Sequence, residues 1–117
     1  MPRFFAVYTM KPEDLATFRA QAKSEQEATD KLGLKAWKEW CERNAAAIVA
    51  TDVMVGKTRR VTTSGIADAQ NQIAGYLIVE AADITAAAGI FQDHPHITVF
   101  PGDGIDVMPV VTGPPED

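Results

Sequence analysis

The sequence predicts one small α+β domain, in which strands and helices follow one another in the order β-α-β-β-α-β. Three observations support this prediction: the length, the composition, and two kinds of hydrophobic periodicity that alternate along the chain. A chain of 117 residues has room for one core. Hydrophobic residues make up 46% and charged residues 23%, which is typical of a folded chain. The predicted domain spans residues 1–112, and residues 113–117 are predicted to form a disordered tail.

The N-terminal third predicts a strand, a short helix and a polar connection. Aromatic and β-branched residues crowd the stretch Arg3–Thr9, which is typical of a mostly buried strand. Pro12 suits the first turn of a helix, and the acidic residues after it suit the positive end of the helix dipole. Residues 23–31 are polar, so they are interpreted as a loop or a frayed helix.

Apolar residues at steps of three or four predict the clearest helix over residues 34–48. Trp37 lies near the centre of this stripe and is the expected core anchor, while Trp40 widens the stripe. Cys41 lies in the same stripe and is interpreted as a buried, unreactive thiol. Gly33 is expected to separate this helix from the residues before it.

The next part of the chain predicts two strands and a helix. Alternating β-branched residues over 57–63 predict a strand with one exposed face, and 67–72 is interpreted as a polar connection. Residues 75–80 are apolar almost throughout, which predicts a central strand. Asp83 is a suitable N-cap for an alanine-rich helix over 84–92.

The last part predicts a loop over 93–104, which carries both histidines, and a final strand over 105–111. Pro109 interrupts this strand, which favours an edge position. The resulting order is the ferredoxin-like pattern, an antiparallel sheet with two helices on one face. The opposite face would then be bare and apolar. A second copy of the chain is the simplest cover, so the sequence predicts a homodimer.

Several short motifs follow one another from the long predicted helix to the last strand. They are Trp37-x-x-Trp40, Asp52…Gly56, residues 75–81 (GYLIVEA), Ala86-Ala87, Pro95-His96 and residues 102–107 (GDGIDV). In this order and spacing they resemble the YCII-related family, also called YciI-like or DGPF domains. The resemblance implies that residues 1–112 form a single YCII-like domain, and that two copies pair into a dimeric α–β barrel.

The same resemblance implies a cleft between helices and sheet that holds a small molecule. Some members of the family are proposed to use a His–Asp pair as acid and base. Asp52 matches the acid of that pair. The stretch from Trp37 to Trp40, where the histidine would lie, contains none.

Charge and composition exclude several classes of function. The formal net charge is −5, and the only basic cluster, Lys57, Arg59 and Arg60, is too small to bind a nucleic acid. No apolar run reaches the ~20 residues that a membrane helix needs, and the N-terminal stretch lacks a signal-peptide pattern. Cys41 is the single cysteine, so an internal disulfide is excluded and a cytoplasmic location is expected.

Asp52 and His96 are the candidate catalytic residues. An acid that follows an apolar stretch, here residues 45–50, is a candidate base. The alternative for Asp52 is a turn residue that bonds its local backbone. His96 is a candidate because imidazole titrates near neutrality, and a structural role after a helix end is its alternative.

Five residues are candidates for ligand binding. Trp37 and Trp40 could line an aromatic pocket, although core packing explains at least one of them. Tyr76 could offer its hydroxyl to a ligand or to the partner chain. Arg59 and Arg60 could anchor an acidic ligand, although one of them is expected to be solvated.

No metal ion or cofactor is expected. His94 and His96 are the only histidines, and Asp93 and Asp103 flank them. Pro95 interrupts the simple alternation of side chains, and no third ligand lies at a recognised spacing.

The sequence therefore leaves two functions open. The first is a cofactor-free enzyme or ligand-binding protein for a small acidic or carbonyl compound, with a cleft near Trp37, Asp52, Tyr76 and His96. The second is a non-catalytic dimeric module that uses the same cleft for recognition only. No motif in the chain specifies a reaction.

Overall fold

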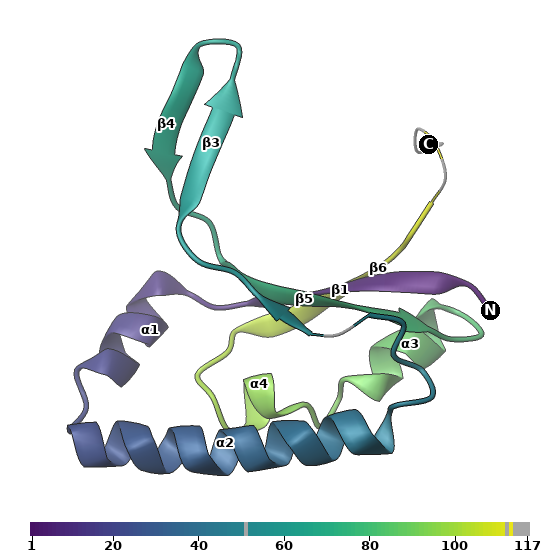
Figure 1. The fold of residues 1–117 in the computed structure, drawn as a ribbon, viewed down its shortest axis with the longest axis horizontal. Helices are drawn as coiled ribbons and strands as arrows, with labels where there is room; N and C mark the ends of the chain where they lie inside the picture. The colour runs from purple at the N-terminus through teal and green to yellow at the C-terminus, as the bar shows by residue number, and fades with distance from the viewer. Residues whose placement is uncertain (51, 112, 114–117) are drawn as a thin grey trace.

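A computed structural model of the chain describes residues 1–50, 52–111 and 113. Its main sheet has four antiparallel strands in the spatial order β2-β5-β1-β6. These strands are β1 (Arg3–Thr9), β2 (Val53–Met54), β5 (Ile73–Glu80) and β6 (Gly104–Pro109). The helices are α1 (Pro12–Arg19), α2 (Lys23–Arg43), α3 (Ile84–Ile90) and α4 (Pro95–Thr98), and they lie on one side of this sheet (Figure 1).

The mixed α+β class and the antiparallel sheet with helices are confirmed. The first strand has the predicted bounds, and β5 has a strand on each side, as expected of a central strand. The Asp83 carboxylate accepts a hydrogen bond from the Ala86 amide at 2.8 Å, so it caps α3 as predicted. The predicted tail, 113–117, lies outside the described residues except for Gly113.

The long helix differs from its prediction at both ends. Residues 23–31 were interpreted as a loop or a frayed helix, and α2 already starts at Lys23, so the loop alternative is wrong. The helix ends at Arg43 instead of residue 48. Gly33 lies inside the helix, where an added Cβ would overlap the ring of Phe100. Glycine at this position leaves room for the ring, a requirement that no pattern in the neighbouring sequence reveals.

The buried stripe of α2 is also rotated relative to the prediction. Trp40 is completely buried, Trp37 and Cys41 are half-buried, and Leu34 is 66% exposed. The core anchor of this helix is therefore Trp40 and not Trp37. Trp40 donates its indole N–H to the Ile90 carbonyl at 3.2 Å, which joins α2 to α3.

The strand predicted over 57–63 does not belong to the main sheet. β3 (Thr58–Thr62) pairs instead with β4 (Gly65–Ala69), which overlaps the polar connection predicted over 67–72. Gly65 has a φ of 123°, which suits it to the tight turn between the two strands. The main sheet takes its strand from β2, which pairs with Tyr76 and Gly75 of β5.

Smaller corrections concern the last third of the chain. The helix predicted over 84–92 ends at Ile90, and the loop predicted over 93–104 contains the one-turn helix α4. The last strand runs over Gly104–Pro109, two residues short of its predicted end, and lies at the sheet edge as expected.

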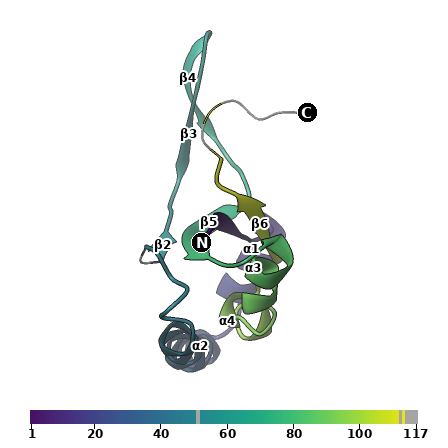
Figure 2. The same ribbon diagram turned by 90° about the vertical axis from the view of Figure 1, so that its right-hand side faces the viewer.

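The core lies between the sheet and the helices. Its buried members are Phe4, Ala6, Tyr8, Trp40, Leu77, Val79, Ala81, Ala87 and Phe91. Alternation along β1 and β5 sends Phe5, Tyr76 and Ile78 to the opposite face of the sheet. Over the described residues no helix covers this second face, which we call the outer face (Figure 2).

Candidate functional site

The carboxylate of Asp52 is the centre of the candidate site. Its Oδ1 accepts a hydrogen bond from the Tyr8 hydroxyl at 2.7 Å. Its Oδ2 accepts hydrogen bonds from the Trp37 indole N–H and, at 3.6 Å, from the Cys41 thiol. Three side chains from β1 and α2 therefore hold one carboxylate that lies just before β2.

The backbone around Asp52 explains its position. Before it, the amide of Val49 bonds to the carbonyl of Ile78 at 2.9 Å, and Ile48 forms an isolated bridge with Val79. After it, the amide of Val55 bonds to the carbonyl of Ala74 at 3.0 Å. The chain is thus fixed to β5 on both sides of Asp52, which holds this residue at the sheet edge.

A buried pair of histidines lies behind Trp37 and Tyr8. His94 and His96 are 0% and 1% exposed. His94 Nδ1 accepts the backbone N–H of His96 at 2.9 Å, and this bond caps α4. His96 Nε2 donates to the Thr9 carbonyl at 2.7 Å, since a carbonyl oxygen can only accept.

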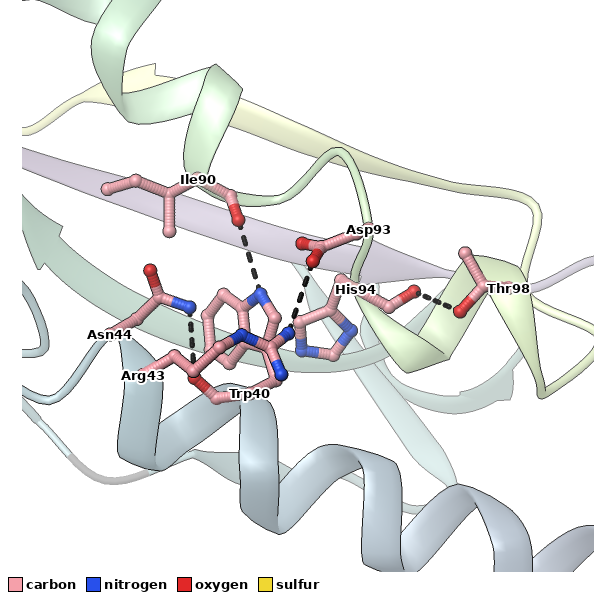
Figure 3. A network of polar contacts seen from close by, with 7 residues as sticks. All are labelled: Trp40, Arg43, Asn44, Ile90, Asp93, His94 and Thr98. Carbon is pink, nitrogen blue, oxygen red and sulfur yellow. Dashed lines mark hydrogen bonds and ion pairs between the residues drawn. The ribbon is translucent and has the colours of Figure 1, made fainter.

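Aromatic rings enclose the imidazole of His94. The ring centroids of Trp37 and Trp40 lie 4.3 and 4.4 Å from its own, both at steep angles. Figure 3 shows this imidazole beside Trp40, with the ion pair of Arg43 and Asp93 nearby. His94 Nε2 has no hydrogen-bond partner among the described residues.

The local electrostatics leave these neighbours uncharged near neutral pH. Burial, followed by the hydrogen bond to Asp52, raises the pKa of the Tyr8 hydroxyl. Burial and the Asp52 charge raise the pKa of the Cys41 thiol to about 11. Burial lowers the pKa of His94 to about 3, and it also lowers the pKa of His96. The arrangement is therefore one carboxylate surrounded by neutral donors.

The predicted site residues do not all meet. Asp52 and Trp37 are in contact, and His96 lies one layer behind them, with its ring centroid 6.5 Å from that of Trp37. Trp40 is buried in the core. Tyr76 lies on the outer face, against Phe5 at 5.4 Å between ring centroids. The sequence predicted one cleft near four residues: Trp37, Asp52, Tyr76 and His96. This prediction is not met within the chain, because these residues do not line a common cleft.

The two candidate arginines lie on β3, away from Asp52. Arg59 forms an ion pair with Asp68 across the hairpin at 3.0 Å, and Arg60 is exposed. Within one chain, neither contacts the carboxylate.

Sequence reasoning missed three residues of this site. Tyr8 was interpreted as part of a buried strand and Cys41 as an inert thiol, yet both donate to Asp52. His94 was assigned to a loop and is instead the N-cap of α4. The His94-Pro95 pair is a usable signal for such a cap, since proline is favoured at the first helical position.

Two open cavities lie along α1. One, of about 340 Å³, lies between α1, α2 and the loop after α4, and is lined by residues such as Asp14, Thr29 and Phe100. The other, of about 520 Å³, lies between α1 and Gln70. Neither of these cavities includes Asp52.

Two absences can be stated for the described ranges. No group of three or more His, Cys, Asp or Glu side chains in them lies close enough to hold a metal ion. In the same ranges, no helix combines the length and the apolar character needed to span a bilayer.

Comparison with known proteins gives a likeness in structure. No protein-family model matches the sequence, and no curated protein matches it. The chain is similar in structure to 5-chloro-2-hydroxyhydroquinone dehydrochlorinase from Burkholderia phenoliruptrix AC1100, in complex with 2,5-dihydroxybenzoquinone. The comparison covers 95% of each chain with a TM-score of 0.52 and 16% identity. At this identity the likeness shows the fold alone.

Proposed function

We propose that the chain binds a small hydroxyl- or carbonyl-bearing compound at Asp52 and performs acid/base chemistry on it without a cofactor. The similar dehydrochlorinase was solved with 2,5-dihydroxybenzoquinone, a small ring that carries both kinds of group. This ligand class also agrees with the small carbonyl ligand expected from the sequence.

One observation carries the proposal: three side-chain donors orient the Asp52 carboxylate, and the rest of the described residues leave one of its acceptor positions open. An ionised carboxylate offers about four lone-pair positions. Oδ2 uses two of them for Trp37 and Cys41, and Oδ1 uses one for Tyr8. The remaining position, on Oδ1, is where a ligand hydroxyl or an acidic C–H would donate.

The proposed chemistry is a proton transfer. Asp52 takes a proton from a hydroxyl group, or from a carbon beside a carbonyl, and returns it to another atom of the same ligand. Tyr8 supports this step as a neutral donor, because its pKa is raised. His96 has no direct part in the proposal, since its Nε2 is already bonded to Thr9 and its ring is buried.

The proposed assembly is a homodimer of ferredoxin-like, YCII-related protomers that forms a dimeric α–β barrel in the cytoplasm. The apolar outer face, with Phe5, Tyr76 and Ile78, supports this assembly because a second copy would remove it from water.

The first prediction tests the site with Asp52→Asn, which preserves the shape of the side chain but removes its charge. We expect 2,5-dihydroxybenzoquinone or a related small hydroxy-carbonyl compound to raise the melting temperature of the unaltered chain. The dissociation constant of the same compound, taken from the concentration dependence of this rise, should be at least tenfold higher for Asp52→Asn, because the charged acceptor is lost. Asp30→Asn, an exposed acid on α2, is the matched control. Equal binding by both variants would exclude Asp52 as the ligand's acceptor.

A non-catalytic binding module is the second candidate. It is favoured by the described neighbours of Asp52: Tyr8 and Cys41 have raised pKa values, so neither readily gives up a proton near neutral pH, and His94 is uncharged. Chromatography of the bound compound after prolonged incubation separates the two: unchanged compound favours the module, and a new product that needs Asp52 favours the enzyme.

A further inference from the structure

The hairpin of β3 and β4 stands away from the rest of the chain. Its five residue pairs run from Thr58↔Ala69 to Thr62↔Gly65, and neither strand pairs with the main sheet. In both views the hairpin rises on the side of the sheet opposite the helices (Figures 1 and 2). We call residues 57–70, which comprise this hairpin and its base, the arm.

The arm is poorly supported within one chain. A single two-stranded hairpin is marginally stable in water, because it has little apolar surface to bury. Val61 and Ile66 face each other near its tip, and they are 73% and 69% exposed. Two large apolar residues paired on an exposed strand surface mark a contact that one chain does not supply.

The arm and the outer face are on the same side of the molecule. Figure 2 shows the chain continuing from β2, at the sheet edge, upward into the arm on the side away from the helices. The pairing of β1 with β5 places Phe5, Tyr76 and Ile78 on the outer face. A body placed on the outer face would therefore lie beside the arm. The large apolar side chains on this side are Phe5, Tyr76 and Ile78 on the outer face and Val61 and Ile66 near the tip of the arm.

Charge complementarity favours a second copy of this chain as that body. The arm carries Lys57, Arg59 and Arg60 but only one acid, Asp68, whereas the whole chain has a formal net charge of −5. Arg59 and Asp68 neutralise each other, so Lys57 and Arg60 leave the arm positive. Asp106, opposite Val7 on the outer face, adds an exposed acid to the surface that a partner's arm would meet.

We propose that the β3–β4 arm embraces a second copy of this chain, with Val61 and Ile66 packed on the partner's body. This proposal rests on the homodimer proposed above and adds the means by which the two copies hold each other. It gives the arm a purpose that the fold of one protomer does not provide.

The test measures the dissociation constant of the dimer by sedimentation or light scattering over a series of protein concentrations. The double variant Val61→Asp with Ile66→Asp should raise this constant by about 100-fold or more, because it places charges in an apolar contact. Leu34→Asp is the matched control, since Leu34 is similarly exposed but lies on α2, and its dimer should be unchanged. Near-UV circular dichroism of the tryptophans shows that each variant is folded.

A variant of the outer face separates the arm from the dimer itself. Ile78→Asp should also produce monomers, since it alters the face that the partner covers. If Ile78→Asp is monomeric while the arm variant dimerises like the unaltered chain, the arm proposal is overturned and the dimer survives. If the unaltered chain is itself monomeric at micromolar concentration, both proposals are overturned.

Trypsin provides a second measurement on the unaltered chain. It cuts after lysine and arginine, and the arm carries three such residues. Cleavage at Lys57, Arg59 and Arg60 should slow as protein concentration rises through the dissociation constant. An equal rate in monomer and dimer would mean that no partner covers the arm.

Discussion

Trp40 and Trp37 lie one turn apart on α2 and have different roles. Trp40 is completely buried against Phe91, with ring centroids 5.3 Å apart, and donates to the Ile90 carbonyl. Trp40→Ala should lower the free energy of unfolding by ~3–5 kcal/mol, as is usual for a buried tryptophan. Trp37→Ala should cost less, because its ring is only half-buried. Urea unfolding measures both, and an equal or larger loss for Trp37 would contradict this assignment.

The site residues show how far single positions can be predicted. Asp52 was identified because an acid follows an apolar stretch, and that pattern is local. Tyr8 was not, since an apolar strand predicts only that its ring is buried. Its hydroxyl meets a carboxylate 44 residues away in sequence, and this pairing depends on how β1 and the segment before β2 are placed together. Burial can be predicted from pattern, whereas the partner of a buried polar group cannot.

Two glycines, Gly33 in α2 and Gly89 in α3, should respond to alanine with opposite signs. An added Cβ at Gly33 overlaps the ring of Phe100, while at Gly89 nothing lies within 4 Å. Gly33→Ala should therefore destabilise the fold by about 1–3 kcal/mol, since the ring must move. Gly89→Ala should stabilise it by about 0.5–1 kcal/mol, because alanine favours helix. Thermal unfolding compares them, and stabilisation by Gly33→Ala would show that Phe100 is not held against α2.

The elements differ in how well the sequence predicted them, for physical reasons. β1 and the cap of α3 depend on neighbouring residues, and both were predicted with their bounds or capping residue. Gly33 inside α2 lies against Phe100, which is remote in sequence, so it was interpreted as a break in the helix. The alternation in β3 correctly indicated a strand but gave no information on its partner, which is β4 and not the sheet.

At the scale of the whole molecule, the sheet depends on pairings between distant segments. β1 lies between β5 and β6, so the first strand of the chain is completed only by the last. The insertion of the arm leaves this sheet intact, because β2 needs only Val53 and Met54 to pair with β5. The α+β class and the antiparallel sheet with helices were therefore predictable from the sequence, whereas the hairpin of the arm and the sheet strand β2 were not.

The two buried histidines should make the stability of the whole fold depend on pH. Burial lowers the pKa of His94 from 6.5 to about 3, so this imidazole is neutral in the folded chain at mildly acidic pH, and burial also lowers the pKa of His96. The unfolded chain binds more protons than the folded chain below about pH 6.5. Their contribution to stability is thus fully present above that pH and is lost as the pH falls toward the folded pKa values.

Between about pH 6.5 and 5 these two histidines are the main groups that titrate, since the chain contains no other histidine and carboxyl groups usually titrate at lower pH. Urea unfolding should therefore show the free energy falling by up to about 1.4 kcal/mol per histidine for each pH unit. His94→Asn provides the control, because the amide oxygen can accept the His96 N–H and cap α4 but does not titrate. It should remove the part of the slope that His94 contributes in this range. A slope that is unchanged in His94→Asn would mean that His94 takes up its proton without unfolding the chain, and that its imidazole is accessible to water in the folded state.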